Sequence, residues 1–272
     1  MSSVASADTS AIIQIKDMSH AYGAQGGAGA QGGTLALSNV NLEIRRNEFV
    51  TLLGPSGCGK TTLMRAIGGL VTPTSGRVLV NGRQVRGPNL DCAIVFQNFA
   101  LMPWASVLQN VAFGLEMRGV GKEERLAKAR DAIAQVGLKG FEDKYPKQLS
   151  GGMQQRVGLA RALVVSTPIM LMDEPFGALD QQTRRYMQEE LLRIWQQDQR
   201  SVVFVTHDME EAILLADRVV LMSNRPGRIE EVIDIGFERP RNPEEVERLP
   251  QFVELKEYLW NRLKQMHEMS AA

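Results

Sequence analysis

The chain has 272 residues, 44% apolar and 23% charged, and its 31 lysines and arginines balance 31 aspartates and glutamates. This length suits one large α/β domain with an appendage or two small domains, and the zero net charge gives no general basic field for nucleic acid. Two cysteines provide no disulfide framework. No apolar run could span a bilayer and the N-terminal residues do not resemble a secretory signal, so we expect a cytosolic protein.

The first part of the chain predicts β-structure. We expect residues 1–11 to be disordered and a strand to run from residue 12 to Tyr22. Residues 23–33, GAQGGAGAQGG, predict a flexible loop with no core of its own. Residues 35–44 alternate apolar and polar side chains, which is typical of an antiparallel strand with one solvated face.

Residues 49–53, FVTLL, predict a short buried parallel strand, and GPSGCGKTT follows at the start of a helix that Gly68-Gly69 would end. A strand, a glycine-rich loop and a G-K-T helix start form the context of a phosphate-binding P-loop, although a chance match in an ordinary turn is the alternative. The glycines let backbone N–H groups surround an anion, Lys60 can reach the β- and γ-phosphates, and Thr61 can ligate Mg²⁺. The residues expected to bind the nucleotide here are Gly54, Pro55, Ser56, Gly57, Cys58, Gly59, Lys60, Thr61 and Thr62.

After a hairpin signal at Asn81-Gly82 and a strand at residues 93–96, the pattern becomes helical. Ser106 is a plausible cap of the first helix, and a third helix begins at Ser150. Two apolar stripes are expected to face the core: Leu108, Val111, Ala112 and Leu115, then Leu126, Ala129, Ile133 and Val136.

From residue 168 onward, the sequence predicts strands that alternate with helices. The expected strands are residues 169–172, 202–205, 219–222 and 229–235, and the expected helices are residues 181–197 and 209–216. The tail from Pro243 predicts a helix whose apolar face must cover this domain or a partner. That face carries Phe252, Leu255, Leu259, Leu263 and Met266.

Asp173 and Glu174 follow the strand at 169–172. Carboxylates at the end of a buried parallel strand lie where ligands bind in open α/β sheets. Asp173 can hold Mg²⁺, and Glu174 can polarise a water molecule for attack on the γ-phosphate. An acidic strand end without a special role is the alternative, and the P-loop favours the catalytic interpretation.

Residues 149–156, LSGGMQQR, present a serine, two glycines and a helix start to an anion, as the P-loop does, although an ordinary helix cap is the alternative. With this signature, the chain resembles the ATP-binding subunit of an ABC (ATP-binding cassette) transporter over about residues 12–235. The resemblance implies an α/β, P-loop NTPase fold with a RecA-like core, an antiparallel β subdomain and an inserted helical subdomain at about residues 99–166. It implies an ATPase domain at residues 12–238 and a C-terminal helical extension at 239–272.

The resemblance also implies roles for single residues. Tyr22 would stack on adenine, Gln97 would contact Mg²⁺ and the attacking water, and His207 would contact the γ-phosphate. The catalytic set would be Glu174, His207 and Gln97, and the metal set Thr61, Gln97 and Asp173. Asp180 would belong to a loop that crosses to a second copy of the chain. Residues that would face the ATP of that second copy are Ser150, Gly151, Gly152 and Gln154.

ATP and Mg²⁺ are therefore the expected cofactors, and a second copy is the first expected partner. The segment after Gln97 contains MPW-x-S/T-V-x-x-N, which resembles importers of nitrate, sulfonates and taurine, as do Gly87-Pro88 and the PQF…L…LW tail. Such a system implies membrane permease subunits, a periplasmic solute-binding protein and a location on the cytoplasmic face of the inner membrane. The permease would dock on an apolar patch of Phe99, Leu101, Met102 and Trp104, unless Trp104 belongs to the core.

Two alternatives stay open. A soluble ABC ATPase of DNA repair or translation would usually carry a long coiled-coil insert or two cassettes, and the sequence shows neither. A regulatory cassette that binds ATP without hydrolysis would not need Glu174 and His207. The sequence does not identify the transported solute, because other subunits would bind it.

Overall fold

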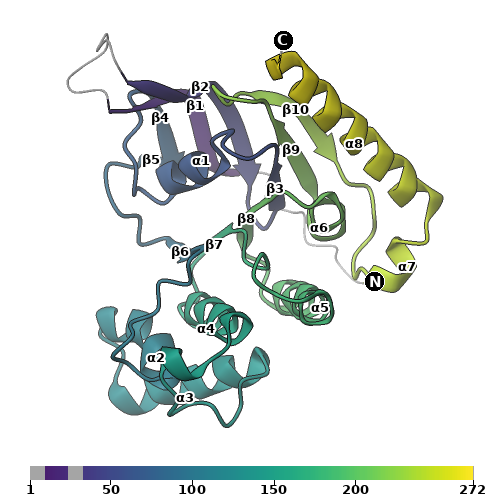
Figure 1. Ribbon diagram of the computed structural model, residues 1–272. Helices are drawn as coiled ribbons and strands as arrows, with labels where there is room; N and C mark the ends of the chain where they lie inside the picture. Colours follow the sequence, from purple (N-terminus) through teal and green to yellow (C-terminus); the bar gives the residue numbers. More distant parts are fainter. Residues whose placement is uncertain (1–9, 24–32, 272) are drawn as a thin grey trace, which may run out of the picture.

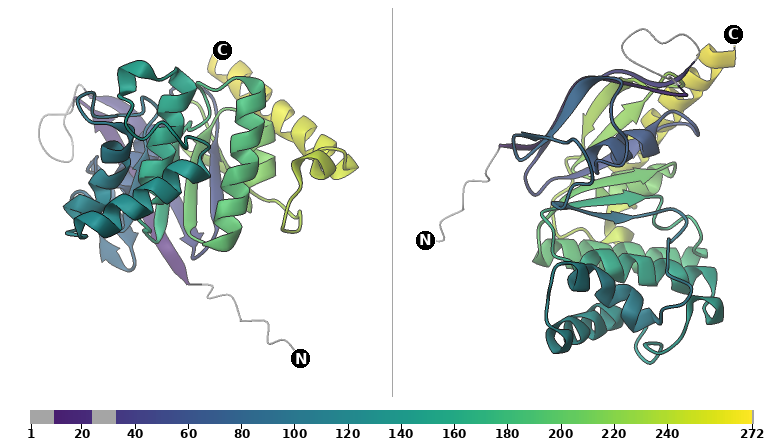
Figure 2. Two further views of the ribbon diagram at one scale, coloured as in Figure 1. Left: turned by 90° about the horizontal axis from the view of Figure 1, so that it is seen from below. Right: turned by 90° about the vertical axis from the view of Figure 1, so that its left-hand side faces the viewer.

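The computed structural model describes residues 10–23 and 33–271. The expected disorder at residues 1–11 and the glycine-rich loop at 23–33 lie mostly outside this range, although Ala11 already begins a strand. Two β-sheets are stacked in the upper part of the molecule, and a group of helices projects from the lower end of the layers (Figures 1 and 2). Across residues 10–23 and 33–271, no helix combines the length and apolarity needed to span a bilayer.

A six-stranded sheet forms the centre of the molecule, in the order β10-β9-β3-β8-β7-β6. Its neighbouring strands are parallel except for the β9–β10 pair. The strand predicted at residues 49–53 is confirmed as β3, and all its residues are buried. Because parallel strands end at the same edge of a sheet, the residues that follow β3, β7 and β8 meet there. The bounds are β3 Phe49–Leu53, β6 Cys92–Val95, β7 Ile169–Asp173, β8 Ser201–Thr206, β9 Arg218–Met222 and β10 Ile229–Asp234.

A second, antiparallel sheet has the order β2-β1-β4-β5. Helix α1 (Lys60–Ile67) packs between the two sheets, because its Leu63 and Met64 share one apolar core with residues of both. The helix ends at Gly68, as predicted. The bounds are β1 Ala11–Tyr22, β2 Thr34–Arg45, β4 Ser75–Val80 and β5 Arg83–Gln84.

The projecting helical group consists of α2 (Val107–Met117), α3 (Lys122–Gln135) and α4 (Gly151–Leu163), seen in teal in Figure 1. Both predicted apolar stripes face its core, with Leu108 and Leu126 only partly buried. Ser106 caps α2 in a capping box with Gln109, because its hydroxyl accepts from Gln109 N at 3.3 Å and Gln109 Oε1 accepts from Ser106 N at 2.8 Å.

Helices α5 (Gln181–Gln197) and α6 (Met209–Leu215) cover the lower face of the central sheet. The tail forms two helices, α7 (Pro243–Val246) and α8 (Pro250–Ala271), because residues 247–249 interrupt the single helix expected from Pro243. Phe252, Leu259 and Met266 are buried in the same core as α6. The apolar face of α8 therefore packs against the core of its own chain.

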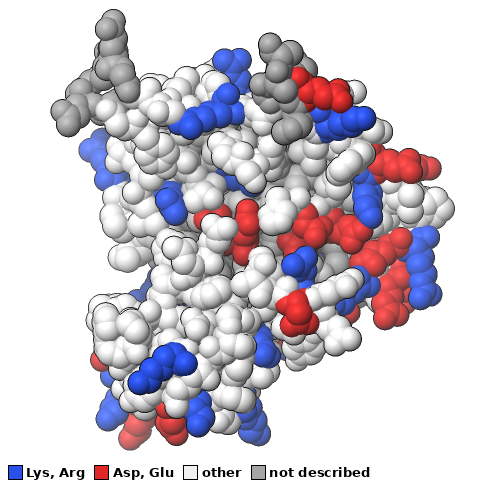
Figure 3. Space-filling model, in the orientation of Figure 1, with Lys and Arg blue, Asp and Glu red and all other residues white. Residues whose placement is uncertain are grey.

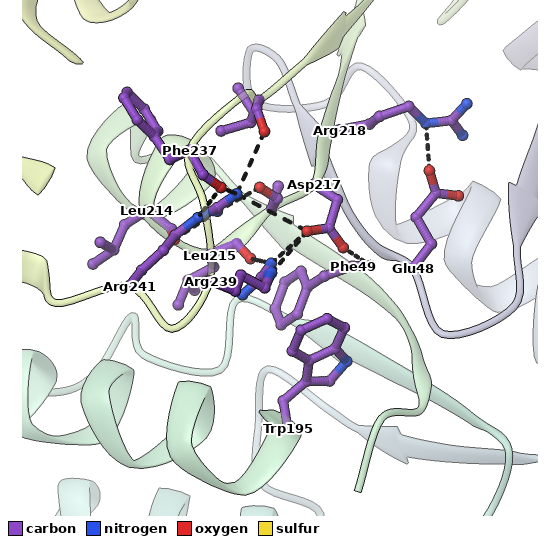
Figure 4. Close-up of polar contacts among 12 residues, drawn as sticks. Glu48, Phe49, Trp195, Leu214, Leu215, Asp217, Arg218, Phe237, Arg239 and Arg241 are labelled. Atoms are coloured by element: carbon purple, nitrogen blue, oxygen red, sulfur yellow. Dashed lines mark hydrogen bonds and ion pairs between the residues drawn. The ribbon is translucent and has the colours of Figure 1, made fainter. Parts of the chain in front are cut away.

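Two arginines, the buried Arg241 and the partly buried Arg239, hold the segment between β10 and α7 against the core (Figure 4). Arg239 donates to Asp217 Oδ1 at 2.8 Å, and its guanidinium lies 4.2 Å from the centre of the Trp195 ring. Arg241 donates to the carbonyls of Leu214 and Ala216 at 3.0 and 2.6 Å, at the C-terminal end of α6. A cation at this helix end satisfies carbonyls that have no partner within the helix.

Candidate functional site

The predicted P-loop connects the carboxyl end of β3 to α1. Gly57 and Gly59 have φ angles of 77° and 98°, in the left-handed region that favours glycine. A Cβ atom on Gly59 would lie 2.5 Å from Leu37 Cδ2, so the loop also depends on glycine for its close contact with β2. The loop therefore has the backbone that an anion cradle requires.

Lys60 is buried beneath this loop. Its Nζ atom donates to the carbonyls of Gly54 and Pro55 at 2.7 and 2.9 Å and lies 3.8 Å from Cys58 Sγ. Burial raises the pKa of the Cys58 thiol, although the neighbouring Lys60 lowers it. Cys58 is thus a neutral packing residue, and Lys60 is the charge at the centre of the loop.

Asp173, the last residue of β7, meets the first turn of α1. The Thr61 hydroxyl donates to Asp173 Oδ1 at 2.8 Å. Burial raises the pKa of Asp173, although the Thr61 hydrogen bond lowers it. A carboxylate and a hydroxyl in contact suit Mg²⁺, which prefers oxygen and takes one or two protein ligands together with substrate phosphates.

Glu174 brings three predicted catalytic residues together. Its Oε2 atom lies 3.2 Å from His207 Nδ1, at the end of β8, and 3.5 Å from Gln97 Nε2, after β6. The residue has a φ angle of 46°, and its backbone N donates to Val205 O at 3.0 Å. A strained backbone held by the sheet therefore aims the carboxylate at its two neighbours.

A pocket of about 370 Å³ lies between the P-loop and Glu174, and neither Asp173 nor His207 is among the described residues that line it. Tyr22 borders it from the antiparallel sheet, with its hydroxyl 3.0 Å from Thr62 Oγ1 and nearly half of its surface exposed. Among the P-loop residues, Ser56, Gly57, Cys58, Gly59, Lys60, Thr61 and Thr62 line the pocket. Gln97 and Glu174 line its other side.

The signature residues lie elsewhere, at the N-terminus of α4 in the helical group. Ser150 caps the helix, since its hydroxyl accepts from Met153 N at 3.3 Å. Gln154 Nε2 donates to Pro146 O at 3.1 Å. Asp180 likewise caps α5 and accepts from Thr183 N at 3.0 Å. None of these described residues lines the P-loop pocket of the same chain.

The segment predicted to dock a permease is only partly exposed. Trp104 is 77% exposed, so the interpretation of Trp104 as a core residue is wrong. Phe99, Leu101 and Met102 are half-buried, and Leu101 packs against the core of the helical group. The apolar surface is therefore smaller than predicted and centres on Trp104.

Sequence reasoning missed two residues that line the pocket, Ala36 on β2 and Arg225 in the turn after β9. Neither stands in a recognisable motif, and only the packing of distant segments brings them to the P-loop. It also missed a larger cleft of about 820 Å³ between α5 and α6. Acidic side chains gather over this part of the surface in Figure 3, and Asp208, Glu210 and Glu211 are among those lining the cleft.

Comparison with known proteins gives the family. A family model described as "ABC transporter" matches residues 37–177. An uncharacterized ABC transporter ATP-binding protein of Methanocaldococcus jannaschii is 55% identical over 84% of each chain. The nitrate import ATP-binding protein NrtD of Synechocystis is 43% identical over 93% of this chain and 95% of that protein. The taurine import ATP-binding protein TauB of Escherichia coli is 43% identical over 87% of this chain and 94% of that protein.

Among solved structures, the dimeric post-hydrolysis state of the ATP-binding cassette MJ0796 with ADP and Pi superposes with a TM-score of 0.73. It is 34% identical and covers 83% of this chain and all of that one. These matches confirm the predicted α/β, P-loop NTPase fold and the predicted resemblance. The chain belongs to the ABC transporter family, as an ATP-binding subunit with ATPase activity.

Proposed function

We propose that the P-loop pocket is the hydrolytic site. Lys60 and the loop N–H groups would hold the phosphates, and Tyr22 would stack on adenine. Glu174 would take a proton from the attacking water, while Gln97 and His207 would orient that water and the γ-phosphate. The single observation that carries this proposal is the Glu174 carboxylate between Gln97 and His207 beside the P-loop.

We also propose Mg²⁺ as the cofactor, held by Thr61 and Asp173 with Gln97 nearby. The ion would neutralise charge on the β- and γ-phosphates during hydrolysis. Thr61 and Asp173 already form a hydrogen-bonded pair of oxygen ligands, which supports this assignment.

Ser150, Gly151, Gly152 and Gln154 would complete the site of a second copy. The support is that they lie at a helix start away from the chain's own pocket, with Ser150 and Gly151 exposed, and that the cassette with ADP and Pi is dimeric. Two pockets would then lie in one two-fold interface, with Asp180 crossing it. ATP would draw the copies together and hydrolysis would release them.

For the complete system, we propose an importer of small anions such as nitrate, sulfonates or taurine. The 43% identity to NrtD and TauB over most of their lengths supports this proposal. The chain would lie on the cytoplasmic face of the inner membrane, bound to permease subunits near Trp104 and supplied by a periplasmic solute-binding protein. We retain the division into an ATPase domain at residues 12–238 and an extension at 239–272 as part of this proposal.

Uptake measurements test the importer assignment, and ATPase measurements test the hydrolytic site. Chromosomal Lys60→Ala is expected to abolish uptake of one of the three anions, and the purified variant to lose ATPase activity. Unchanged uptake of all three would contradict the importer assignment. ATPase activity equal to the parent would contradict the hydrolytic site itself.

A further inference from the structure

The nucleotide pocket has a second cation at its rim. Among the described residues that line it, only Lys60 and Arg225 carry a positive charge. Lys60 is buried under the loop, whereas Arg225 is exposed. We propose that Arg225 is a further nucleotide-binding residue that contacts the ribose and α-phosphate of bound ATP. This inference rests on the proposed use of the pocket for ATP.

The position of Arg225 indicates which part of the nucleotide it contacts. Arg225 Nε donates to Leu35 O at 3.2 Å, and Leu35 pairs with Ala21 in the β1–β2 ladder. The next residue, Tyr22, reaches the pocket from the same sheet. The carboxylates that would act on the γ-phosphate come instead from β7 of the central sheet. Arg225 therefore belongs to the base end of the pocket.

The turn that carries Arg225 is fastened on three sides. Gly227 N donates to Ala36 O at 2.9 Å, and Ser38 N donates to Gly227 O at 3.0 Å, which joins the turn to β2. A Cβ atom on Gly227 would lie 1.9 Å from Cys58 O, so the turn also touches the P-loop. Asn224 Nδ2 donates to Met266 O at 2.6 Å and ties the turn to α8. The backbone of Arg225 is thus held before the ligand arrives, which lowers the entropic cost of its contact.

The chemistry of the side chain fits a phosphate and a sugar. A guanidinium has five N–H donors in a planar fork, and the bond to Leu35 uses one of them. The others can donate to phosphate oxygens and ribose hydroxyls. Because the negative charge of ATP is spread over three consecutive phosphates, a cation beside the α-phosphate complements Lys60, which would reach the β- and γ-phosphates.

Calorimetric titration of ATP and ADP into the purified chain tests this proposal, with Arg225→Gln and a matched control, Arg228→Gln, in the same turn. Arg225→Gln is expected to raise the Kd of both nucleotides about tenfold, because both contain the α-phosphate. The ATPase KM should rise with kcat unchanged, since the contact is equal in the ground and transition states. Arg228→Gln should behave as the parent. Equal affinities for the two variants, or a loss confined to ATP, would overturn the assignment.

Arg225→Lys and thermal unfolding separate ligand contact from a structural brace on Leu35. The lysine retains the charge, so it is expected to bind both nucleotides more tightly than Arg225→Gln. If both variants instead lowered the Tm equally and bound nucleotide equally, Arg225 would only brace β2. Failure of the parent to bind ATP would contradict the proposed function, whereas parental binding in Arg225→Gln would contradict this inference alone.

Discussion

Glu174 Oε2 lies 3.2 Å from His207 Nδ1, although the two residues are separated by the whole of α5 and β8. The pair forms because β7 and β8 are parallel neighbours, so the residues after them emerge at the same edge of the sheet. The carboxylate that we propose to polarise water thus lies next to the side chain that we propose to contact the γ-phosphate.

Glu174→Gln is expected to lower kcat of the ATPase by about 10²–10⁴-fold, because an amide cannot accept the proton of the attacking water. ATP affinity should stay within about threefold of the parent, since the side chain keeps its size and its neighbours. Glu189→Gln, on the exposed side of α5, is the control and should retain parental activity. Steady-state ATPase assays with Mg²⁺ measure the effect, and a kcat equal to that of the control would disprove the role of Glu174.

Ser150→Ala is expected to reduce ATP-dependent dimerisation, because Ser150 would contact the nucleotide of a second copy. Ser106→Ala is a matched control, since both hydroxyls cap a helix in the same helical group and accept a backbone N–H at 3.3 Å. Each change should cost about 1 kcal/mol of stability through loss of the cap. Light scattering with ATP measures the dimerisation of both variants, each combined with Glu174→Gln so that ATP is not hydrolysed during the measurement. Equal dimerisation of the two variants would show that Ser150 acts only as a cap.

Trp104→Ala is expected to impair uptake without changing the basal ATPase rate of the isolated chain, since the exposed ring would contact the permease. The hot spots of such interfaces are often single aromatic residues, worth about 2 kcal/mol or more. Trp260→Ala removes a second exposed tryptophan, on α8, and serves as the control. Co-purification of the permease and whole-cell uptake should fall for Trp104→Ala only. Equal losses of co-purification and uptake in both variants would argue against a specific permease-binding site at Trp104.

Motifs made much of this fold and site predictable. The P-loop strand, its helix and the carboxylates at the end of β7 each follow from local sequence, and parallel strands bring them to the same edge of the sheet. Arg225 and Ala36 could not be predicted, because only the packing of the turn after β9 on β2 brings them to the pocket. Similarly, the apolar stripe of α8 predicted a buried face, but not that α6 would provide much of its contact.

Glu211 is expected to make stability depend on pH. Burial raises its pKa above the ordinary value of 4.5, although the Thr206 hydroxyl, which donates at 2.7 Å, acts in the opposite direction. The folded chain therefore holds a proton on Glu211 more tightly than the unfolded chain does. As pH rises from about 4.5 through the folded pKa, the parent should lose stability relative to Glu211→Gln, which does not titrate. Urea unfolding of both proteins between pH 4.5 and 8 measures this difference, and a constant difference would contradict the prediction.

Arg241→Met is expected to destabilise the chain by about 3–5 kcal/mol, because it leaves the carbonyls at the end of α6 without a donor in a buried site. Burial lowers the pKa of Arg241 to about 10, so the guanidinium still carries its charge at pH 7. Since α6 begins directly after His207 and Asp208, a loosened helix should also lower ATPase activity. Arg193→Met, which removes an exposed cation paired with Glu190, should cost less than about 1 kcal/mol. Urea unfolding at pH 7 measures both changes, and similar costs for the two variants would show that Arg241 does not stabilise the end of α6.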